Sequence, residues 1–251
     1  MKTAICALLP LAAAMGAAPG PKAQEIARAT MQAMGGQDAW ARARFVRFDF
    51  IVKLGARELI DRSYLWEKGT GRCRLEDTAG SGEPGVVLFN TGNAHGAAYV
   101  AGKKLEGEAA GAAIEGARRT FREDIYWLAM PWMWMEPGVR LKYLGKKTLA
   151  GGEFDLVELT FADGGPRSGD RYVAYVSPRS HLMAHCEYTP KSGEKGMWDW
   201  EYTTTGGVKL ASNHTNSEKH ASIGMGDVRV LDKVDDAFLT DPGHRLAELR
   251  R

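Results

Sequence analysis

The stretch FVRFDFIVK, residues 45–53, decides the fold. Apolar side chains at positions 46, 48, 50 and 52 alternate with polar ones at positions 47, 49 and 53. Because successive side chains of a strand point to opposite faces of a sheet, this period of two predicts a strand with one buried face. The chain therefore turns from helical spacing to strand spacing near residue 44.

A helix is predicted before this strand, over residues 22–34. Its apolar residues Ile26 and Met31 lie near one stripe of the helix, and Gly35-Gly36 gives it a natural stop. Residues 37–43 add a short second helical turn. The N-terminal part of the chain is thus expected to supply helix to a domain that is otherwise built from strands.

Eleven further strands are predicted after residue 53, separated by turns rich in glycine, proline or polar residues. They are Glu58–Trp66, Gly71–Asp77, Val86–Asn90, Ala97–Ala101, Val139–Leu144, Phe154–Phe161, Arg171–Ser177, Leu182–Tyr188, Met197–Thr203, Val208–Ser212 and Asp227–Val234. One internal helix, Ala109–Ala129, interrupts them, with apolar residues three or four positions apart at Ile114, Ala117, Phe121, Ile125 and Leu128. This pattern predicts one mainly β domain, a curved antiparallel sheet whose concave face is plugged by the helices.

The first residues have the features of a secretory signal peptide. Lys2 gives a positive start, residues 4–18 are apolar and rich in alanine, and small residues follow. Cleavage is compatible with positions after Gly16, Ala18 or Ala23. We therefore expect a signal peptide over residues 1–23, a single domain over residues 24–251, and a soluble protein in the periplasm that does not span the membrane.

Charge and motifs exclude several classes of function. The formal net charge is only +2 with scattered basic residues, which does not favour nucleic acid. The sequence lacks the common zinc and serine-nucleophile motifs, and the glycine-rich stretch at residues 80–85 precedes a strand instead of a helix. No metal or cofactor is expected. Cys73 and Cys186 are compatible either with a disulfide or with two small buried side chains.

A cluster of tryptophan and methionine follows the internal helix, at residues 127–135. Flexible methionine and large, flat tryptophan side chains suit the lip of a cavity for an apolar ligand, although the same residues could pack the end of the helix against the sheet. Aromatic residues on the inner sheet face and on the helix could likewise line a cavity or pack the core. The candidate ligand-binding residues are Phe48, Phe50, Phe121, Trp127, Met130, Trp132, Met133, Trp134, Trp198 and Trp200.

Several motifs together resemble an uncharacterised bacterial family of exported proteins related to the Lol lipoprotein carriers, the LolA/LolB-like fold. They are Met34-Gly35-Gly36 with Trp40, the segments YWLAMP (126–131) and EPG (136–138), the strand that ends in DLVELTF (155–161), and DRYVAYV (170–176). The resemblance covers nearly all of the expected mature chain. It implies an incomplete β-barrel, helices that close its open mouth, and an apolar cavity between them. Carriers of this fold hold the acyl chains of lipoproteins in transit across the periplasm.

The leading hypothesis is a periplasmic binding or carrier protein for an apolar ligand, such as a lipid acyl chain, with a link to lipoprotein or envelope transport. Transient contact with an envelope protein would accompany such a role. The residues favour a binder over an enzyme because they contain no catalytic signature. Two alternatives stay open, namely a small-molecule enzyme on the same fold and a packed scaffold or interaction protein without a ligand.

Overall fold

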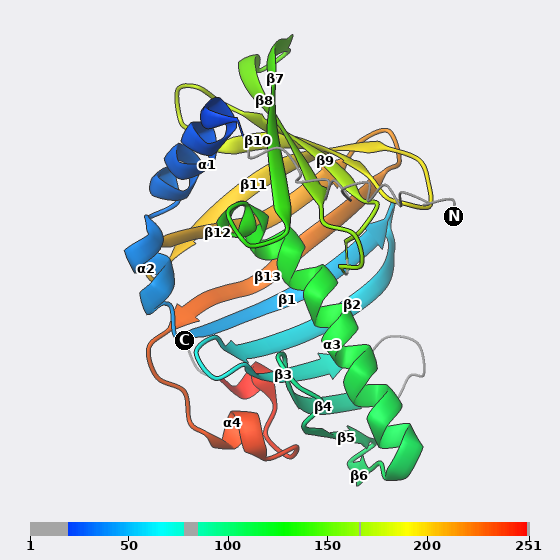
Figure 1. The fold of residues 1–251 in the computed structure, drawn as a ribbon. Helices are drawn as coiled ribbons and strands as arrows, with labels where there is room; N and C mark the ends of the chain where they lie inside the picture. The colour runs from blue at the N-terminus through cyan, green and yellow to red at the C-terminus, as the bar shows by residue number, and fades with distance from the viewer. Residues whose placement is uncertain (1–19, 78–84, 166, 250–251) are drawn as a thin grey trace, which may run out of the picture.

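A computed structural model of the protein describes residues 20–77, 85–165 and 167–249. Within them the chain forms one antiparallel sheet in the order β6-β5-β4-β3-β2-β1-β13-β12-β11-β10-β9-β8-β7. The order begins at β6 and ends at β7, so this sheet is not closed into a barrel. Figure 1 shows it curving around one long helix. The predicted incomplete barrel is confirmed.

The sheet has two arms that meet where β1 pairs with β13; the chain builds the first arm outward from β1 to the edge strand β6, and the second inward from the edge strand β7 to β13. The first arm contains β1 (Phe45–Leu54), β2 (Arg57–Glu67), β3 (Arg72–Asp77), β4 (Gly85–Asn90), β5 (Gly96–Val100) and β6 (Lys103–Lys104). The second arm contains β7 (Val139–Leu149), β8 (Gly152–Phe161), β9 (Arg171–Val176), β10 (Met183–Thr189), β11 (Gly196–Thr205), β12 (Val208–Asn216) and β13 (Ala221–Leu231).

Helices lie on both faces of the sheet. On the concave side are α1 (Pro21–Ala33), α2 (Gln37–Arg42), α3 (Gly107–Ala129) and the 3-10 helix η1 (Met130–Met133). Short helices α4 (Ala237–Thr240) and η2 (Leu246–Glu248) follow the last strand. None of the helices in the described ranges combines the length and the apolar composition needed to cross a membrane.

The long helix α3 connects the two arms and buries its apolar stripe in the core. All five residues predicted to form that stripe are at most 7% exposed. Near its start α3 packs against β4 and β5, and near its end against β12. On the sheet, Val46, Phe48 and Phe50 lie in the same core, as the alternation in residues 45–53 predicted.

The turn after α1 is fixed by a close approach of backbone to backbone. Gly35 has a φ of 121°, and a Cβ there would lie 2.2 Å from the carbonyl oxygen of Gly207. Lys209 donates its N–H to the carbonyl of Met34 at 2.7 Å. Only glycine fits this position, so the stop predicted at residues 35–36 also docks the helical pair onto the β11–β12 turn.

Several boundaries differ from the predicted ones. The last strand begins at Ala221 instead of Asp227, because the glycine-containing segment 221–226 is paired along β1. Strand β7 runs on to Leu149 through a bulge after Tyr143, and the short β6 was not predicted. In each case pairing with a neighbouring strand outweighs local composition.

The two cysteines are free and buried, on β3 and β10. Burial raises the pKa of both thiols, which act as small packing residues. Residues 1–19 and 78–84 contain most of the expected signal peptide and of the glycine-rich stretch, and they lie outside the described residues.

A buried arginine on β3 holds the C-terminal segment, residues 235–249, against the face of the sheet opposite α3. The guanidinium of Arg74 is fully buried and donates to the carbonyls of Asp241 at 2.8 Å and Pro242 at 3.2 Å. It also contacts the carbonyls of Phe238 and His244 and pairs with Glu76. Leucines 239 and 246 then pack on Phe45 and Leu65. The arginine therefore supplies donors to four backbone carbonyls in and after α4.

We predict that Arg74→Ala loosens this segment, because it leaves several buried carbonyls without a donor. The free energy of unfolding should fall by about 3 kcal/mol, the usual cost of removing one partner from a buried charged network. Urea unfolding measures the loss, and limited proteolysis should show faster cleavage within residues 235–249. The exposed Arg57→Ala on β2 is the control. Equal losses in the two variants would contradict the role of Arg74.

Candidate functional site

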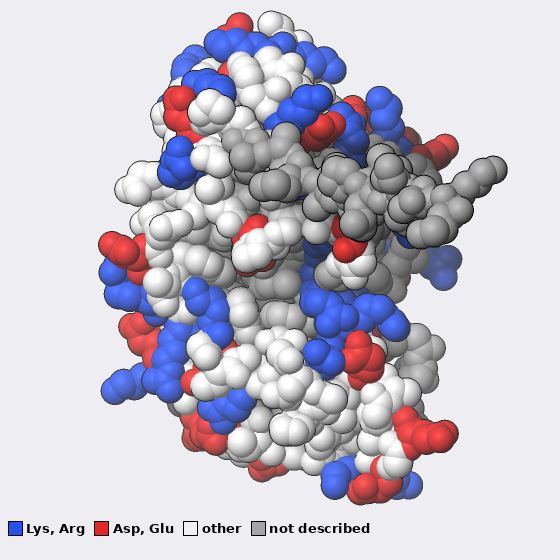
Figure 2. Space-filling view, viewed as in Figure 1, with Lys and Arg blue, Asp and Glu red and all other residues white. Residues whose placement is uncertain are grey.

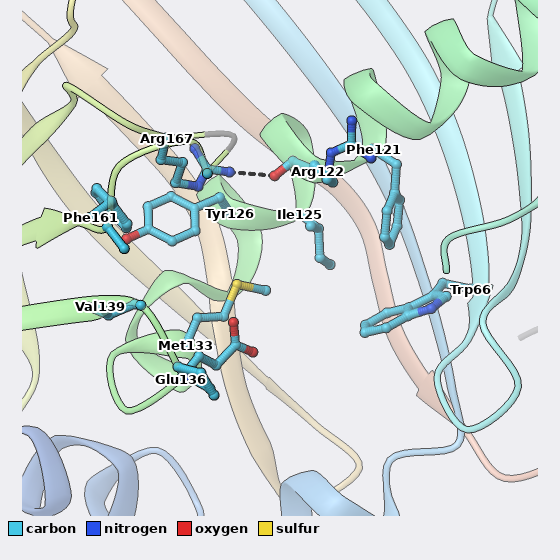
Figure 3. A pocket seen from close by; sticks show the side chains of 14 residues that line it. Trp66, Phe121, Arg122, Ile125, Tyr126, Met133, Glu136, Val139, Phe161 and Arg167 are labelled. Atoms are coloured by element: carbon cyan, nitrogen blue, oxygen red, sulfur yellow. Dashed lines mark hydrogen bonds between the residues drawn. The ribbon is translucent and has the colours of Figure 1, made fainter. Parts of the chain in front are cut away.

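A pocket of about 350 Å³ opens beside the C-terminal half of α3. Its walls come from α3, from η1 and the turn that follows it, from the paired ends of β7 and β8, from the β8–β9 connection, and from Trp66 on β2 (Figure 3). The volume lies at the lower end of the range of small-molecule sites. The apolar side chains that line it are Trp66, Phe121, Ile125, Met133, Pro137, Val139, Phe161 and Ala162.

Helical spacing places four side chains on the α3 wall. Phe121 and Ile125 are four residues apart, as are Arg122 and Tyr126, so each pair is stacked along one side of the helix. Phe121 also meets the edge of Trp66, with ring centroids 5.4 Å apart. The α3 wall therefore presents an aromatic and aliphatic surface together with the Arg122 side chain.

The opposite wall is set by the proline and glycine that follow η1. Gly138 has a φ of 88°, and its carbonyl accepts the N–H of Ala162 at 2.8 Å. This contact joins the start of β7 to the end of β8, where Val139 is paired with Phe161. Glu136 lies in the same turn and lines the pocket.

Arg167 ties the β8–β9 connection to α3 along one side of the pocket. Its guanidinium carbon lies 3.7 Å from the centroid of the Tyr126 ring, a cation–π contact. One guanidinium nitrogen donates to Glu123 at 3.0 Å, and the other donates to the carbonyl of Arg122 (Figure 3). Arg167 is only 8% exposed, so a loop residue acts as part of the packed interior.

Two polar groups of the pocket are affected by burial. The Tyr126 hydroxyl has no hydrogen-bond partner in the described part of the chain, and burial raises its pKa. Desolvation also raises the pKa of Glu136, while the nearby Arg167 acts in the opposite direction. Both groups therefore favour their neutral forms more than they would in water.

A buried carboxylate beside the pocket fastens α3 to the sheet. Asp124 accepts hydrogen bonds from the Tyr64 hydroxyl at 2.7 Å and from Arg62 at 3.1 Å, both on β2. Desolvation raises the pKa of Asp124 to about 6, although Arg62 and Tyr64 oppose the shift. The next residue along the helix, Ile125, lines the pocket, so this contact sets the height of α3 above the sheet at that point.

The structure brings only two of the ten predicted ligand-binding residues, Phe121 and Met133, to this pocket. Six others are buried among core side chains: Phe48, Phe50, Met130, Trp132, Trp134 and Trp200. Trp132, for example, stacks on Trp40 and donates its indole N–H to the carbonyl of Lys209 at 3.0 Å. Trp127 and Trp198 are half-buried and pack beside the same core.

Trp127 and Trp198 belong to an aromatic cluster between the end of α3 and strands β10 to β12. The Trp127 ring stacks on Trp200 at 5.8 Å and meets Trp198 at 5.2 Å. His214 lies against both Trp127 and Trp200, with its Nε2 3.0 Å from the carbonyl of Trp127. Burial lowers the pKa of His214 to about 3, so the ring is neutral and donates one N–H to that carbonyl. The cluster attaches the end of α3 to the second arm of the sheet.

The pocket also contains residues that the sequence did not single out. Ile125 was predicted to be on the buried stripe of the internal helix, but Tyr126, Glu136 and Phe161 were noted only within family motifs. No sequence feature pointed to Arg167, because it lies in a glycine-rich connection whose path depends on the contacts between Arg167 and α3. Among the described residues, no group of three or more histidine, cysteine, aspartate or glutamate side chains could hold a metal ion.

No model of a known protein family matches the chain, and no curated protein matches it significantly. Solved structures do match. A DUF1329 family protein from Desulfovibrio piger is 11% identical with a TM-score of 0.48, over 91% of this chain and 99% of that one. A LolA superfamily protein from Nitrosomonas europaea is 13% identical with a TM-score of 0.46, over 86% of this chain and 96% of that one.

A putative outer membrane lipoprotein-sorting protein domain from Vibrio parahaemolyticus is 15% identical with a TM-score of 0.44, over 87% of this chain and 96% of that one. The matches thus include the LolA group that the sequence motifs resemble. All three TM-scores lie below 0.5, so these likenesses carry no conclusion about function.

We predict that Asp124 makes the stability of the protein depend on pH. Its pKa is about 6 in the folded state and near 3.9 in an unfolded chain, so protonation favours the folded state. The contribution is fully present below pH 3.9 and is lost as the pH rises through 6. It should amount to about 3 kcal/mol, from a shift of roughly two pKa units.

The measurement is urea unfolding of the wild type and of Asp124→Asn between pH 3.5 and pH 7.5. Asparagine can still accept from Tyr64 and Arg62 but does not titrate, and the other titrating groups cancel in the comparison. The wild type should lose stability relative to the variant as the pH rises. A difference that is constant over this range would show that Asp124 has an ordinary pKa.

Proposed function

We propose that the protein binds an apolar small molecule or a lipid acyl chain in the α3 pocket and serves as a periplasmic carrier or sensor of that ligand. The pocket itself carries the proposal. It is a hollow of about 350 Å³ that the apolar stripe of α3 does not fill. The signal-peptide pattern in residues 1–23 supports the compartment.

The lining supplies enough apolar contact for such a ligand. Burying one methylene group is worth about 0.8 kcal/mol, so an alkyl chain of eight carbons gains roughly 6 kcal/mol before the costs of ordering are subtracted. Met133 offers a polarizable side chain that adapts to different shapes. Affinity in this pocket therefore follows from contact area and needs no catalytic group.

Binding accounts for the pocket better than catalysis does. None of the described residues that line it is serine, threonine, cysteine, histidine, aspartate or lysine. Glu136 could serve as a base, but the described lining residues give it no serine, threonine or cysteine nucleophile to activate. Arg167 is engaged with Glu123 and with the helix backbone. Loading and release would take place by transient contact with an envelope component.

We predict that Val139→Trp weakens binding by filling the pocket. The neutral dye N-phenyl-1-naphthylamine serves as the probe, with dissociation constants taken from its fluorescence increase. Dye affinity should fall at least about tenfold, equivalent to 1.4 kcal/mol. Val139 lies half-buried at the start of β7, so the larger side chain can be accommodated without opening the core.

The control is Val100→Trp, which adds the same side chain at an exposed position on β5 outside the pocket. It should bind the dye like the wild type. If the wild type binds no dye, or if Val139→Trp and Val100→Trp bind the dye with equal affinity, the result would argue against a ligand in this pocket.

A further inference from the structure

A carboxylate that makes no hydrogen bond or ion pair within the described residues lies on the wall of the pocket. Glu136 lies in the turn between η1 and β7, where its N–H donates to Met133 at 3.1 Å and its carbonyl accepts from Val139 at 3.2 Å. These two hydrogen bonds fix the backbone from which the side chain projects. In Figure 3 the carboxylate points into the space bounded by Met133, Ile125 and Trp66.

The other charges at the pocket already have partners. Arg167 donates to Glu123 at 3.0 Å, and Arg122 lies 3.6 Å from Glu115. In the described ranges, Glu136 has neither an ion pair nor a hydrogen bond to its carboxylate. Among the described residues, Arg167 is the cation that acts electrostatically on Glu136, but its hydrogen bonds go to Glu123 and to the carbonyl of Arg122. Glu136 is an exposed residue, so its carboxylate is accessible to a ligand, and desolvation by the neighbouring side chains raises its pKa.

The walls near this carboxylate are aromatic. Trp66 and Phe121 form an edge-to-face pair on the side of the pocket across from the η1–β7 turn. Aromatic rings attract a cation over their faces, and the attraction is greater where water is excluded. A carboxylate with free hydrogen-bonding capacity and two aromatic rings around an apolar hollow are complementary to a cationic group on an apolar body.

We infer that the ligand of this pocket is a cationic amphiphile, in which an amine at one end of an apolar chain pairs with Glu136. The inference rests on the proposed function and deepens it by naming the class of ligand. A protonated amine would donate to the carboxylate while its alkyl chain lies along Ile125 and Met133. Both arginines among the described lining residues are already paired with glutamates, Arg167 with Glu123 and Arg122 with Glu115, so an anionic head group would have to compete for them.

The test compares three probes with the same chain: octylamine, 1-octanol and octanoate. The affinity of each probe is measured from its displacement of N-phenyl-1-naphthylamine at pH 7.5 and low ionic strength. Under these conditions the amine is protonated and the acid is ionised. Octylamine should bind about tenfold more tightly than octanol, as expected for a hydrogen bond to a charged group. Octanoate should bind more weakly than octanol.

Glu136→Gln keeps the size of the side chain and removes its charge. It should abolish the preference, so that octylamine and 1-octanol bind this variant with equal affinity. The control, Glu108→Gln, alters an exposed glutamate in the first turn of α3, away from the pocket, and should keep the full preference. Loss of the preference in both variants would overturn the role of Glu136, because a general surface charge would then explain it.

The outcomes also separate this inference from the proposed function. If octanol binds and octylamine shows no advantage, the pocket takes an apolar ligand but not a cationic one, and the inference is wrong. A preference for octanoate would overturn it in the same way. If none of the three probes displaces the dye, the proposed function fails and the inference fails with it.

Discussion

The packing of α3 against the concave face of the sheet is the interaction on which the rest of the structure depends. A sheet that curves without closing leaves one face to be covered, and within the described residues α3 crosses most of that face. Its apolar stripe is buried from Ile114 to Leu128. The hydrophobic effect thus holds the helix in place, and the width of the stripe determines how much of the hollow is filled.

Polar contacts then fix the height and direction of the helix. Asp124 ties the C-terminal half of the helix to β2, and the carbonyl of Trp127 meets His214 on β12. Arg167 joins the same region to the β8–β9 connection. These contacts hold α3 between the two arms, while the turn at Glu136–Val139 stays far enough away to leave a pocket. The pocket is therefore a consequence of where α3 is anchored.

Much of the fold could be predicted from the sequence because it depends on local periodicity. The alternation in residues 45–53 and the three-and-four spacing after Ala109 each mark a buried face without reference to the rest of the chain. The glycine stop at residues 35–36 could be predicted for the same reason. Where pairing between distant segments determines the end of a strand, as in residues 221–226 of β13, local composition gave the wrong boundary.

The pocket was less predictable than the fold. A tryptophan or methionine suits both a packed core and a cavity wall, and Trp132 and Trp134 show that most of the residue 127–135 cluster serves the core. Arg167 could not be found, because its burial depends on a long-range contact with Glu123 and Tyr126. Glu136 is a polar residue in a turn, and only the fold places it on the wall of a cavity.

The most direct test of the central claim is hydrogen–deuterium exchange of the protein with and without saturating 1-octanol. If α3 leaves an open pocket beside its C-terminal half, octanol should slow exchange in residues 121–139 and 161–167. Residues 235–249, on the opposite face of the sheet, should exchange as before. Protection spread evenly over the chain, or confined to regions outside the pocket, would contradict the account.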